Sequence, residues 1–250
     1  MGIEARARGV LRTAAREVSR LVIPVQCPGC GEPDVRWCAR CAKAFHHPPE
    51  RMEHLIPRLD LGHGAPVLPV WSLTPYSGTT RPMIVAWKDR GRADLDDLVS
   101  PAIHRACTHL APLMRAALRG VGEEGLTVVT APSSEQSRRV RARDHLAPLA
   151  RAATAALRHQ GINTHHRPLL TRARGRDLSG LGATARTGSV DLKVSQRHRR
   201  RIGTGGSPIA LILDDVVTTG TTLKSMASCL SDVGIEALGA LTLAATPPPE

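Results

Sequence analysis

Residues 209–222, with the sequence IALILDDVVTTGTT, restrict the fold of this chain more than any other stretch. Ile209 to Leu213 form a short apolar run of the kind that becomes a buried strand of a parallel sheet. From Thr221 onward the apolar residues recur at helical spacing and share one face: Leu223, Met226, Ala227, Leu230 and Val233. The sequence therefore predicts a strand, a short loop and a helix, and loops of this kind bind ligands in open α/β sheets.

The loop between this strand and helix carries groups that suit a phosphorylated ligand. Free backbone N–H groups and the helix dipole favour a phosphate at the start of a helix, and the Thr hydroxyls of residues 218–222 add donors. Gly220 lets the backbone come close to the ligand. Asp214 and Asp215 stand just before the loop and can accept from ligand hydroxyls. These groups predict a site for a phosphorylated ribose; the alternative is an ordinary junction with Asp and Thr as helix caps.

The same stretch resembles the binding motif of type I phosphoribosyltransferases, which use 5-phosphoribosyl-1-diphosphate. The resemblance implies that Asp214 and Asp215 are the catalytic pair and contact the 2- and 3-hydroxyls of the ribose. It also implies that the residues after them hold the 5-phosphate: Val217, Thr218, Thr219, Gly220, Thr221 and Thr222. The reaction implied is displacement of diphosphate from C1 of the ribose, with Mg²⁺ bridging the diphosphate and the ribose hydroxyls.

A second motif, CPGCGEPDVRWCARC, holds two CxxC pairs. Zn²⁺ prefers four thiolates in a tetrahedron, and two tight turns joined by a short loop supply that geometry. Disulfides are the alternative, but nothing else in the sequence indicates an oxidising compartment. The motif therefore predicts a small, zinc-ribbon-like module with a structural zinc ion and four ligands: Cys27, Cys30, Cys38 and Cys41.

The rest of the chain divides around these motifs. Residues 1–23 are expected to form a basic amphipathic helix, 24–45 the zinc module, 46–66 a linker rich in Pro, His and Gly, and 67–250 the main domain. Strands are predicted near 70–73, 126–131, 209–213 and 237–244, with helices between them. This alternation predicts an α/β fold, with a mostly parallel sheet flanked by helices.

The net charge and the low aromatic content limit the kinds of ligand that the chain is expected to bind. The formal net charge of +12 favours anionic partners, either nucleic acid or a small polyphosphate. Aromatic residues make up only 2% of the chain, which argues against an autonomous binder of single strands that works by stacking. No apolar stretch is long enough to span a bilayer, and the amino end lacks the apolar region of a signal peptide, so a cytoplasmic location is expected.

Over nearly its full length the chain resembles the ComF family of predicted phosphoribosyltransferases, which is associated with DNA uptake in naturally competent bacteria. A helix ending at Pro24, the CxxC pairs, a YxGxxRxxIxxxK segment from Tyr76 to Lys88 and the carboxyl-terminal motif occur in family order. The resemblance implies a type I phosphoribosyltransferase-like fold. It also implies that Arg81 and Lys88 contact a phosphate or diphosphate, the alternative for both being a solvated helix face.

The chain departs from the family beside the presumed diphosphate loop. Relatives carry Pro-Val-Pro and Arg-Gly-Phe-Asn motifs where this chain has TAPSS and RARDH. The residues that could still bind diphosphate are Ser133, Ser134, Arg138, Arg139 and Arg143. His145 is, by its position, the best candidate for a general base, but a satisfied histidine at a helix start is the interpretation that the sequence favours. The alternative function is a non-catalytic protein that binds phosphoribosyl diphosphate or assists DNA uptake, with single-stranded DNA or competence-machinery proteins as partners.

Overall fold

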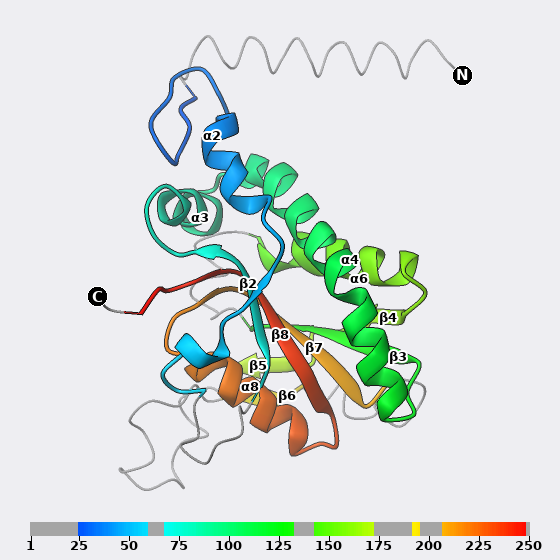
Figure 1. Ribbon diagram of the computed structural model, residues 1–250. Coiled ribbons are helices and arrows are strands. Elements are labelled where there is room, and N and C mark those ends of the chain that lie inside the picture. The colour runs from blue at the N-terminus through cyan, green and yellow to red at the C-terminus, as the bar shows by residue number, and fades with distance from the viewer. Residues whose placement is uncertain (1–24, 60–67, 133–142, 173–191, 196–206, 249–250) are drawn as a thin grey trace, which may run out of the picture.

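The computed structural model describes residues 25–59, 68–132, 143–172, 192–195 and 207–248 of the protein. The helix expected over residues 1–23 lies outside these ranges, as do four residues expected at the diphosphate: Ser133, Ser134, Arg138 and Arg139. Within them the chain forms a central sheet with helices on both faces (Figure 1). In this described part of the chain, no helix has both the length and the apolar character that crossing a bilayer requires.

The central sheet is mostly parallel. From edge to edge its strands run in the order β1-β2-β8-β7-β3-β4, and every neighbouring pair is parallel except β1 and β2. The bounds are β1 Glu50–Arg51, β2 Val70–Pro75, β3 Gly125–Thr130, β4 Asn163–His166, β7 Ile209–Val217 and β8 Glu236–Ala245. A separate antiparallel pair consists of β5 Leu170–Arg172 and β6 Leu192–Val194.

The helices cover the two faces of this sheet separately. Side chains alternate across a strand, so Leu211 and Leu213 of β7 join a core with three helices: α3 Thr80–Asp89, α4 Asp96–Gly120 and α6 Leu146–His159. Ala210 and Ile212 join a second core with α8 Thr221–Ser231. Figure 1 shows α8 on the opposite side of the sheet from α4 and α6. The predicted fold class, an α/β fold with a mostly parallel sheet flanked by helices, is confirmed.

The direction of the chain connections changes between β3 and β7. β3 continues through α6 to β4 on one side of it, whereas β7 continues through α8 to β8 on the other side. Because the chain leaves β3 toward one side of the sheet and leaves β7 toward the other, the boundary between these two strands is a topological switch point. Such a switch point is where open α/β sheets bind ligands.

β7 is longer than the apolar run from which it was predicted. It continues through Val217, so Asp214 and Asp215 are residues of the strand and not of the loop. The hydrogen-bond ladder to β8 reaches the strand end, with Val217 opposite Ala245. Neighbouring strand residues point to opposite faces, and this separates two carboxylates that the sequence analysis treated as one pair.

Part of the segment expected to be a linker packs against the main sheet. Glu50 and Arg51 form β1, and a 3₁₀ helix follows, η2 Glu53–Leu55. Ile56 and Leu59 are buried in the core on the α8 side of the sheet. Burial of these two apolar side chains is favourable, because it removes apolar surface from water. This burial holds the Pro- and His-rich stretch against the sheet.

The cysteine-rich module also packs against the main domain. Its regular elements are α2 Ala39–Ala42 and η1 Lys43–Phe45. Phe45 is buried in the same core as α3 and α4. Arg92, just before the 3₁₀ helix η3 Ala93–Leu95, donates to the backbone carbonyls of Gln26 and Arg36. The module thus contacts the main domain where α3 ends and α4 begins.

Candidate functional site

A small hollow lies where β7 passes into α8. It is lined by Asp214 and the continuous stretch 216–223. The first N–H groups of a helix have no acceptor within the helix, and α8 begins at Thr221 within this lining. The hydroxyls of Thr219 and Thr221 lie 2.9 Å apart on the same loop. The hollow therefore combines backbone donors, hydroxyls and one carboxylate.

Gly220 is required at its position for two reasons. Its φ of +80° lies in the left-handed region, which is strained for other residues. A Cβ at this position would also lie 2.6 Å from Ile56 Cγ2 and 2.8 Å from Leu59 Cγ. In addition, the backbone N–H of Arg58 donates to the carbonyl of Thr219 over 3.1 Å. The stretch 56–59 therefore supports the loop from behind, a contact that no local pattern in the sequence signals.

The two adjacent carboxylates face different surroundings. Asp214 lines the hollow, and its Oδ1 accepts from the backbone N–H of Asp215 over 2.8 Å. Asp215 points to the other face of β7, where Lys88 Nζ lies 2.7 Å from Oδ2 and 2.9 Å from Oδ1. His145 Nε2 donates to the same carboxylate over 2.6 Å. The structure therefore brings Asp214 to the loop and takes Asp215 away from it.

These surroundings shift the pKa values of the two carboxyl groups in opposite directions. Burial raises the pKa of Asp214 to about 7, and the charge of Asp215 adds to the rise. Burial also acts to raise the pKa of Asp215, but the hydrogen bond from His145 and the charge of Lys88 outweigh it and lower that pKa to about 2. Burial acts to lower the pKa of Lys88, but the Asp215 carboxylate outweighs this effect and raises it. Asp215 and Lys88 thus form an ion pair at neutral pH, whereas Asp214 changes charge near neutrality.

His145 is a satisfied histidine at a helix start, the interpretation that the sequence favours. It is the N-cap residue of α6, only 2% exposed, and its ring meets the Trp87 ring edge-on at 5.1 Å. Arg143, considered for the diphosphate, lies 2.8 Å from Asp96 Oδ2 and donates to the Trp87 carbonyl over 3.1 Å. Both side chains therefore belong to the contact between α3, α4 and the start of α6, in which His145 is buried and Arg143 is partly buried.

The two cations that the family resemblance places at the diphosphate lie away from the hollow. Lys88 is turned to Asp215, and Arg81, in the first turn of α3, lies over the Tyr76 ring at 5.9 Å. Arg172, at the end of β5, was not among the residues predicted from the sequence. Its Nε donates to the carbonyl of Pro132, just beyond the carboxyl end of β3, and its charge acts to lower the pKa of Asp214. A single Arg in a strongly basic chain gives no signal that would have selected it.

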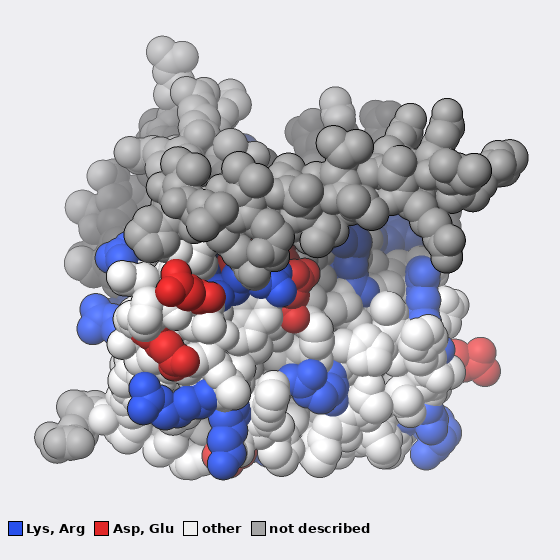
Figure 2. All heavy atoms as spheres, turned by 90° about the horizontal axis from the view of Figure 1, so that it is seen from above, with Lys and Arg blue, Asp and Glu red and all other residues white. Residues whose placement is uncertain are grey.

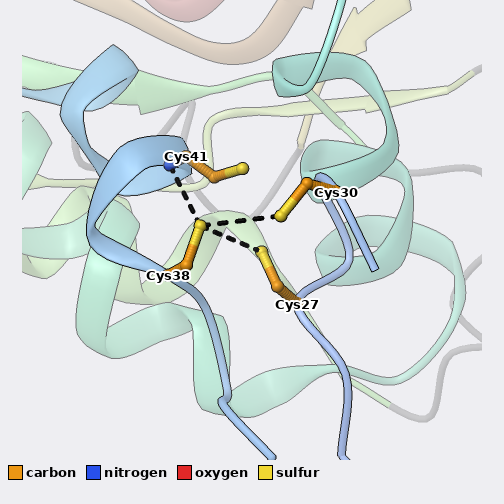
Figure 3. A group of neighbouring side chains, drawn as sticks. All are labelled: Cys27, Cys30, Cys38 and Cys41. Atoms are coloured by element: carbon orange, nitrogen blue, oxygen red, sulfur yellow. Dashed lines mark hydrogen bonds between the residues drawn. The ribbon is translucent and has the colours of Figure 1, made fainter. Parts of the chain in front are cut away.

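The four cysteines of the two CxxC pairs form one cluster, with their side chains pointing toward a common centre (Figure 3). All four sulfurs lie within 4.8 Å of one another; Cys38 Sγ is 3.9 Å from Cys27 Sγ and 3.6 Å from Cys30 Sγ. Four thiolates placed about 2.3 Å from a zinc ion would lie about 3.8 Å apart. All four are free thiols. The cluster can therefore hold a tetrahedral metal ion.

Gly29 allows this cluster to close. A Cβ on this residue would lie 2.8 Å from Cys41 Sγ and 3.1 Å from Met83 Cγ on α3. The first knuckle is also tightened by the N–H of Gly31, which donates to the Cys27 carbonyl over 2.8 Å. Cys38 caps α2 by accepting from the N–H of Cys41. The small residues between the cysteines thus let the backbone pass close to the sulfurs.

Comparisons with known proteins give matches among solved structures alone: no family model and no curated protein matches the chain. Two of the matched structures are hypoxanthine phosphoribosyltransferases of Trypanosoma cruzi. One, from a study of its C-terminal region, is 15% identical, with a TM-score of 0.36 and coverage of 57% of this chain and 63% of that one. The other, a mutant in a ternary substrates complex, is 19% identical, with a TM-score of 0.32 and coverage of 57% and 66%.

A third match is an HPRT in which asparagine replaces an invariant aspartic acid. It is 15% identical, with a TM-score of 0.36 and coverage of 57% of this chain and 64% of that one. The chain thus spans less than two thirds of the length of the first structures that it matches. A similarity at this level adds no weight to any assignment of activity, so the function rests on the site itself.

Proposed function

We propose that this protein binds 5-phosphoribosyl-1-diphosphate at the carboxyl end of β7 and transfers the phosphoribosyl group to an acceptor, as type I phosphoribosyltransferases do. One observation carries the proposal: Asp214 opens directly into a Thr-rich loop at the start of α8, beside the switch point between β3 and β7. The loop and the N–H groups of α8 would hold the 5-phosphate. Asp214 would accept from a ribose hydroxyl.

The reaction proposed is displacement of diphosphate from C1 of the ribose. Positive charge develops on the ring as the C1–O bond breaks, and the Asp214 carboxylate would balance part of it while orienting the hydroxyls. Mg²⁺ bound with the diphosphate would offset the charge of the leaving group. In the described part of the chain, the four cysteines are the one group of three or more side chains placed to hold a metal ion. This fits an Mg²⁺ that arrives on substrate phosphates and needs no protein cage.

Calorimetry with phosphoribosyl diphosphate and Mg²⁺ tests the binding step. The wild type should bind, and Asp214→Asn should weaken binding about tenfold or more, because it removes a charged hydrogen-bond acceptor. Asp232→Asn is the matched control, since Asp232 is an exposed carboxylate just beyond the other end of α8. Equal affinity in the wild type and Asp214→Asn would contradict the proposal.

A second candidate function is binding without transfer, and the position of His145 favours it. The candidate general base is buried and donates to Asp215, so it does not face the hollow. Release of diphosphate during a screen of acceptors separates the two functions. Release above the level of Asp214→Asn supports transfer, whereas tight binding with no release for any acceptor supports the binding function.

A DNA-uptake role, with single-stranded DNA or competence-machinery proteins as partners, belongs to this non-catalytic proposal. The net charge of +12 supports it. In the view of Figure 2, however, the Lys and Arg side chains of the described residues are spread over the surface, and several lie beside Asp or Glu. Binding of single-stranded DNA should fall steeply with salt if phosphates are contacted, as counterions are released. Weak binding even at low salt would argue against this role.

Zinc is the ion proposed for the four-cysteine cluster. The spacing of the sulfurs supports a tetrahedral site, and Cys27, Cys38 and Cys41 are buried, as ligands of a structural site are. Metal analysis of protein purified under reducing conditions should find about one zinc per chain. Metal-free protein with a folded module would overturn the assignment.

A further inference from the structure

Three side chains from distant parts of the chain meet on the face of β7 that points away from the hollow. Lys88 comes from α3, His145 from the start of α6 and Asp215 from β7. The sequence separations to Asp215 are 127 and 70 residues. The side chains of Asp215 and His145 are 4% and 3% exposed, and that of Lys88 is 32% exposed. We refer to Lys88, His145 and Asp215 as the clamp.

The clamp uses the whole hydrogen-bonding capacity of Asp215. An ionised carboxylate offers about four lone-pair positions. Oδ1 accepts from Lys88 Nζ and from the backbone N–H of Val216, and Oδ2 accepts from His145 Nε2 and lies 2.7 Å from Lys88 Nζ. With these four contacts made, Asp215 has no position left for a ribose hydroxyl. Lys88, in turn, is directed at Asp215 and is not part of the lining of the hollow.

We propose that Asp214 is the one carboxylate of the pair that contacts the ligand, and that Lys88 and His145 are positioning residues that act through Asp215. By holding Asp215 on the opposite face, they fix the end of β7 so that Asp214 faces the loop. Lys88 also balances the charge of Asp215 and thereby favours the ionised form of Asp214, which accepts the hydroxyl. This inference rests on the proposed function, because it assigns roles within the same site.

The effect of Lys88 on the ionisation of Asp214 can be measured, because several charges act on Asp214. Asp215 disfavours ionisation of Asp214, whereas Lys88 from α3 and Arg172 from β5 favour it. Removal of Lys88 leaves the charge of Asp215 less well balanced. Asp214 should then ionise at higher pH, and binding that depends on its carboxylate should begin at higher pH too. A residue with a purely structural role would change stability and leave this midpoint in place.

The first experiment follows the Asp carboxyl carbons by NMR in isotopically labelled wild-type protein. Addition of ribose 5-phosphate should shift the carboxyl resonance of Asp214 and leave that of Asp215 unchanged. Equal shifts of both resonances would overturn the proposal. Because this measurement uses the wild type, it does not depend on the folding of a variant.

The second experiment compares Lys88→Met with Lys88→Arg. In Lys88→Met the titration of the Asp214 carboxyl should move to higher pH, and the pH midpoint for binding ribose 5-phosphate should move with it. Lys88→Arg should restore both values. Inorganic phosphate is the control ligand, since it has no ribose hydroxyls and its affinity should be equal in all three proteins. An unmoved Asp214 titration, or a parallel loss of phosphate binding, would overturn the proposal.

Failure of this inference can be told from failure of the proposed function. If the wild type does not bind ribose 5-phosphate, the proposed function fails. The carboxyl titrations without ligand then still decide the effect of Lys88 on Asp214. If the wild type binds ribose 5-phosphate and the carboxyl resonances of Asp214 and Asp215 shift equally, the proposed binding site is supported. The proposal that Asp214 alone contacts the ligand is then wrong.

Discussion

The cysteine cluster and the loop between β7 and α8 are both arranged to hold an ion, but they are built differently. The cluster comes from one short segment, residues 27–41, whose one regular helix is α2. Its four sulfurs converge on a single point (Figure 3). The loop is held by a long strand, by a helix and by the distant residues 56–59. The geometry of the cysteine cluster depends on four side chains that a metal ion would hold together. The geometry of the loop depends on packing of the backbone at Gly220 against Ile56 and Leu59.

The cysteine cluster has the construction expected of a structural metal site, and the loop has the construction expected of a site that binds and releases a ligand. Three of the four cysteines are buried, so an ion there would be enclosed by protein. The loop instead lines a hollow with a carboxylate at its edge, and its donors are backbone N–H groups and hydroxyls. We therefore expect the module to depend on its metal for folding, and the loop to keep its shape whether or not a ligand is bound.

Loss of the metal should have the largest effect. Cys38→Ser should lose the proposed zinc ion and destabilise the module by about 5 kcal/mol or more, because the free energy of binding a structural zinc ion contributes to the free energy of folding. Hydrogen exchange should show lost protection over residues 25–45 with protection retained in β7 and α8. Cys229→Ser is the control, since Cys229 lies in α8 outside the cluster. Equal loss of protection in both regions would remove the contrast between them.

Breaking the clamp should have the next largest effect. Asp215→Asn removes the one buried charge of the pair and leaves the partly exposed Lys88 without its carboxylate partner. The loss of stability should therefore reach at most the roughly 3–5 kcal/mol seen when a fully buried ion pair is broken. Urea unfolding at neutral pH measures the change. A variant as stable as the wild type would show that the clamp does not hold β7 to α3 and α6.

Gly220→Ala tests whether packing holds the loop. The left-handed conformation should be destabilising by about 1–2 kcal/mol, and the contacts with Ile56 and Leu59 should raise the loss to about 2–4 kcal/mol. Gly234→Ala is the matched control, because Gly234 has a φ of +75° but nothing within 4 Å of an added Cβ. Equal losses of free energy of unfolding in the two variants would mean that residues 56–59 do not support the loop.

The remaining predicted effect depends on pH. The folded-state pKa of Asp214, about 7, lies above its unfolded value of about 4, so the folded protein binds the extra proton between these pH values. Ionisation of this group therefore lowers stability as pH rises from about 4 to about 7. Asp214→Asn should be more stable than the wild type at pH 8, by at most the roughly 4 kcal/mol that corresponds to a rise in pKa from about 4 to about 7, and the difference should vanish near pH 4. Thermal unfolding at the two pH values measures it, and a pH-independent difference would contradict the assigned pKa.

The sequence predicted those features whose cause is local. Apolar spacing gave β7 and α8, and the two CxxC pairs gave a cluster that the structure assembles. The strand expected over 237–244 is present as β8, Glu236–Ala245. These predictions succeeded because periodicity and short-range spacing alone determine which residues share a face or can reach one ion.

The surroundings of the carboxylates could not be predicted in this way. Lys88 and His145 reach Asp215 across 127 and 70 residues, and no short pattern relates them. The support of Gly220 by Ile56 and Leu59 likewise arises from tertiary packing. Asp214 and Asp215 looked equivalent because the strand was expected to end before them. Extension of β7 to Val217 is what sends their side chains to opposite faces.

The most direct test of the central claim is a crystal structure of the protein with phosphoribosyl diphosphate and Mg²⁺. The 5-phosphate should lie about 3 Å from backbone nitrogens of residues 218–222, and a ribose hydroxyl should lie at hydrogen-bond distance from Asp214. Asp215 should keep its contacts with Lys88 and His145. A 5-phosphate bound elsewhere, or a ribose with no contact to Asp214, would contradict the account.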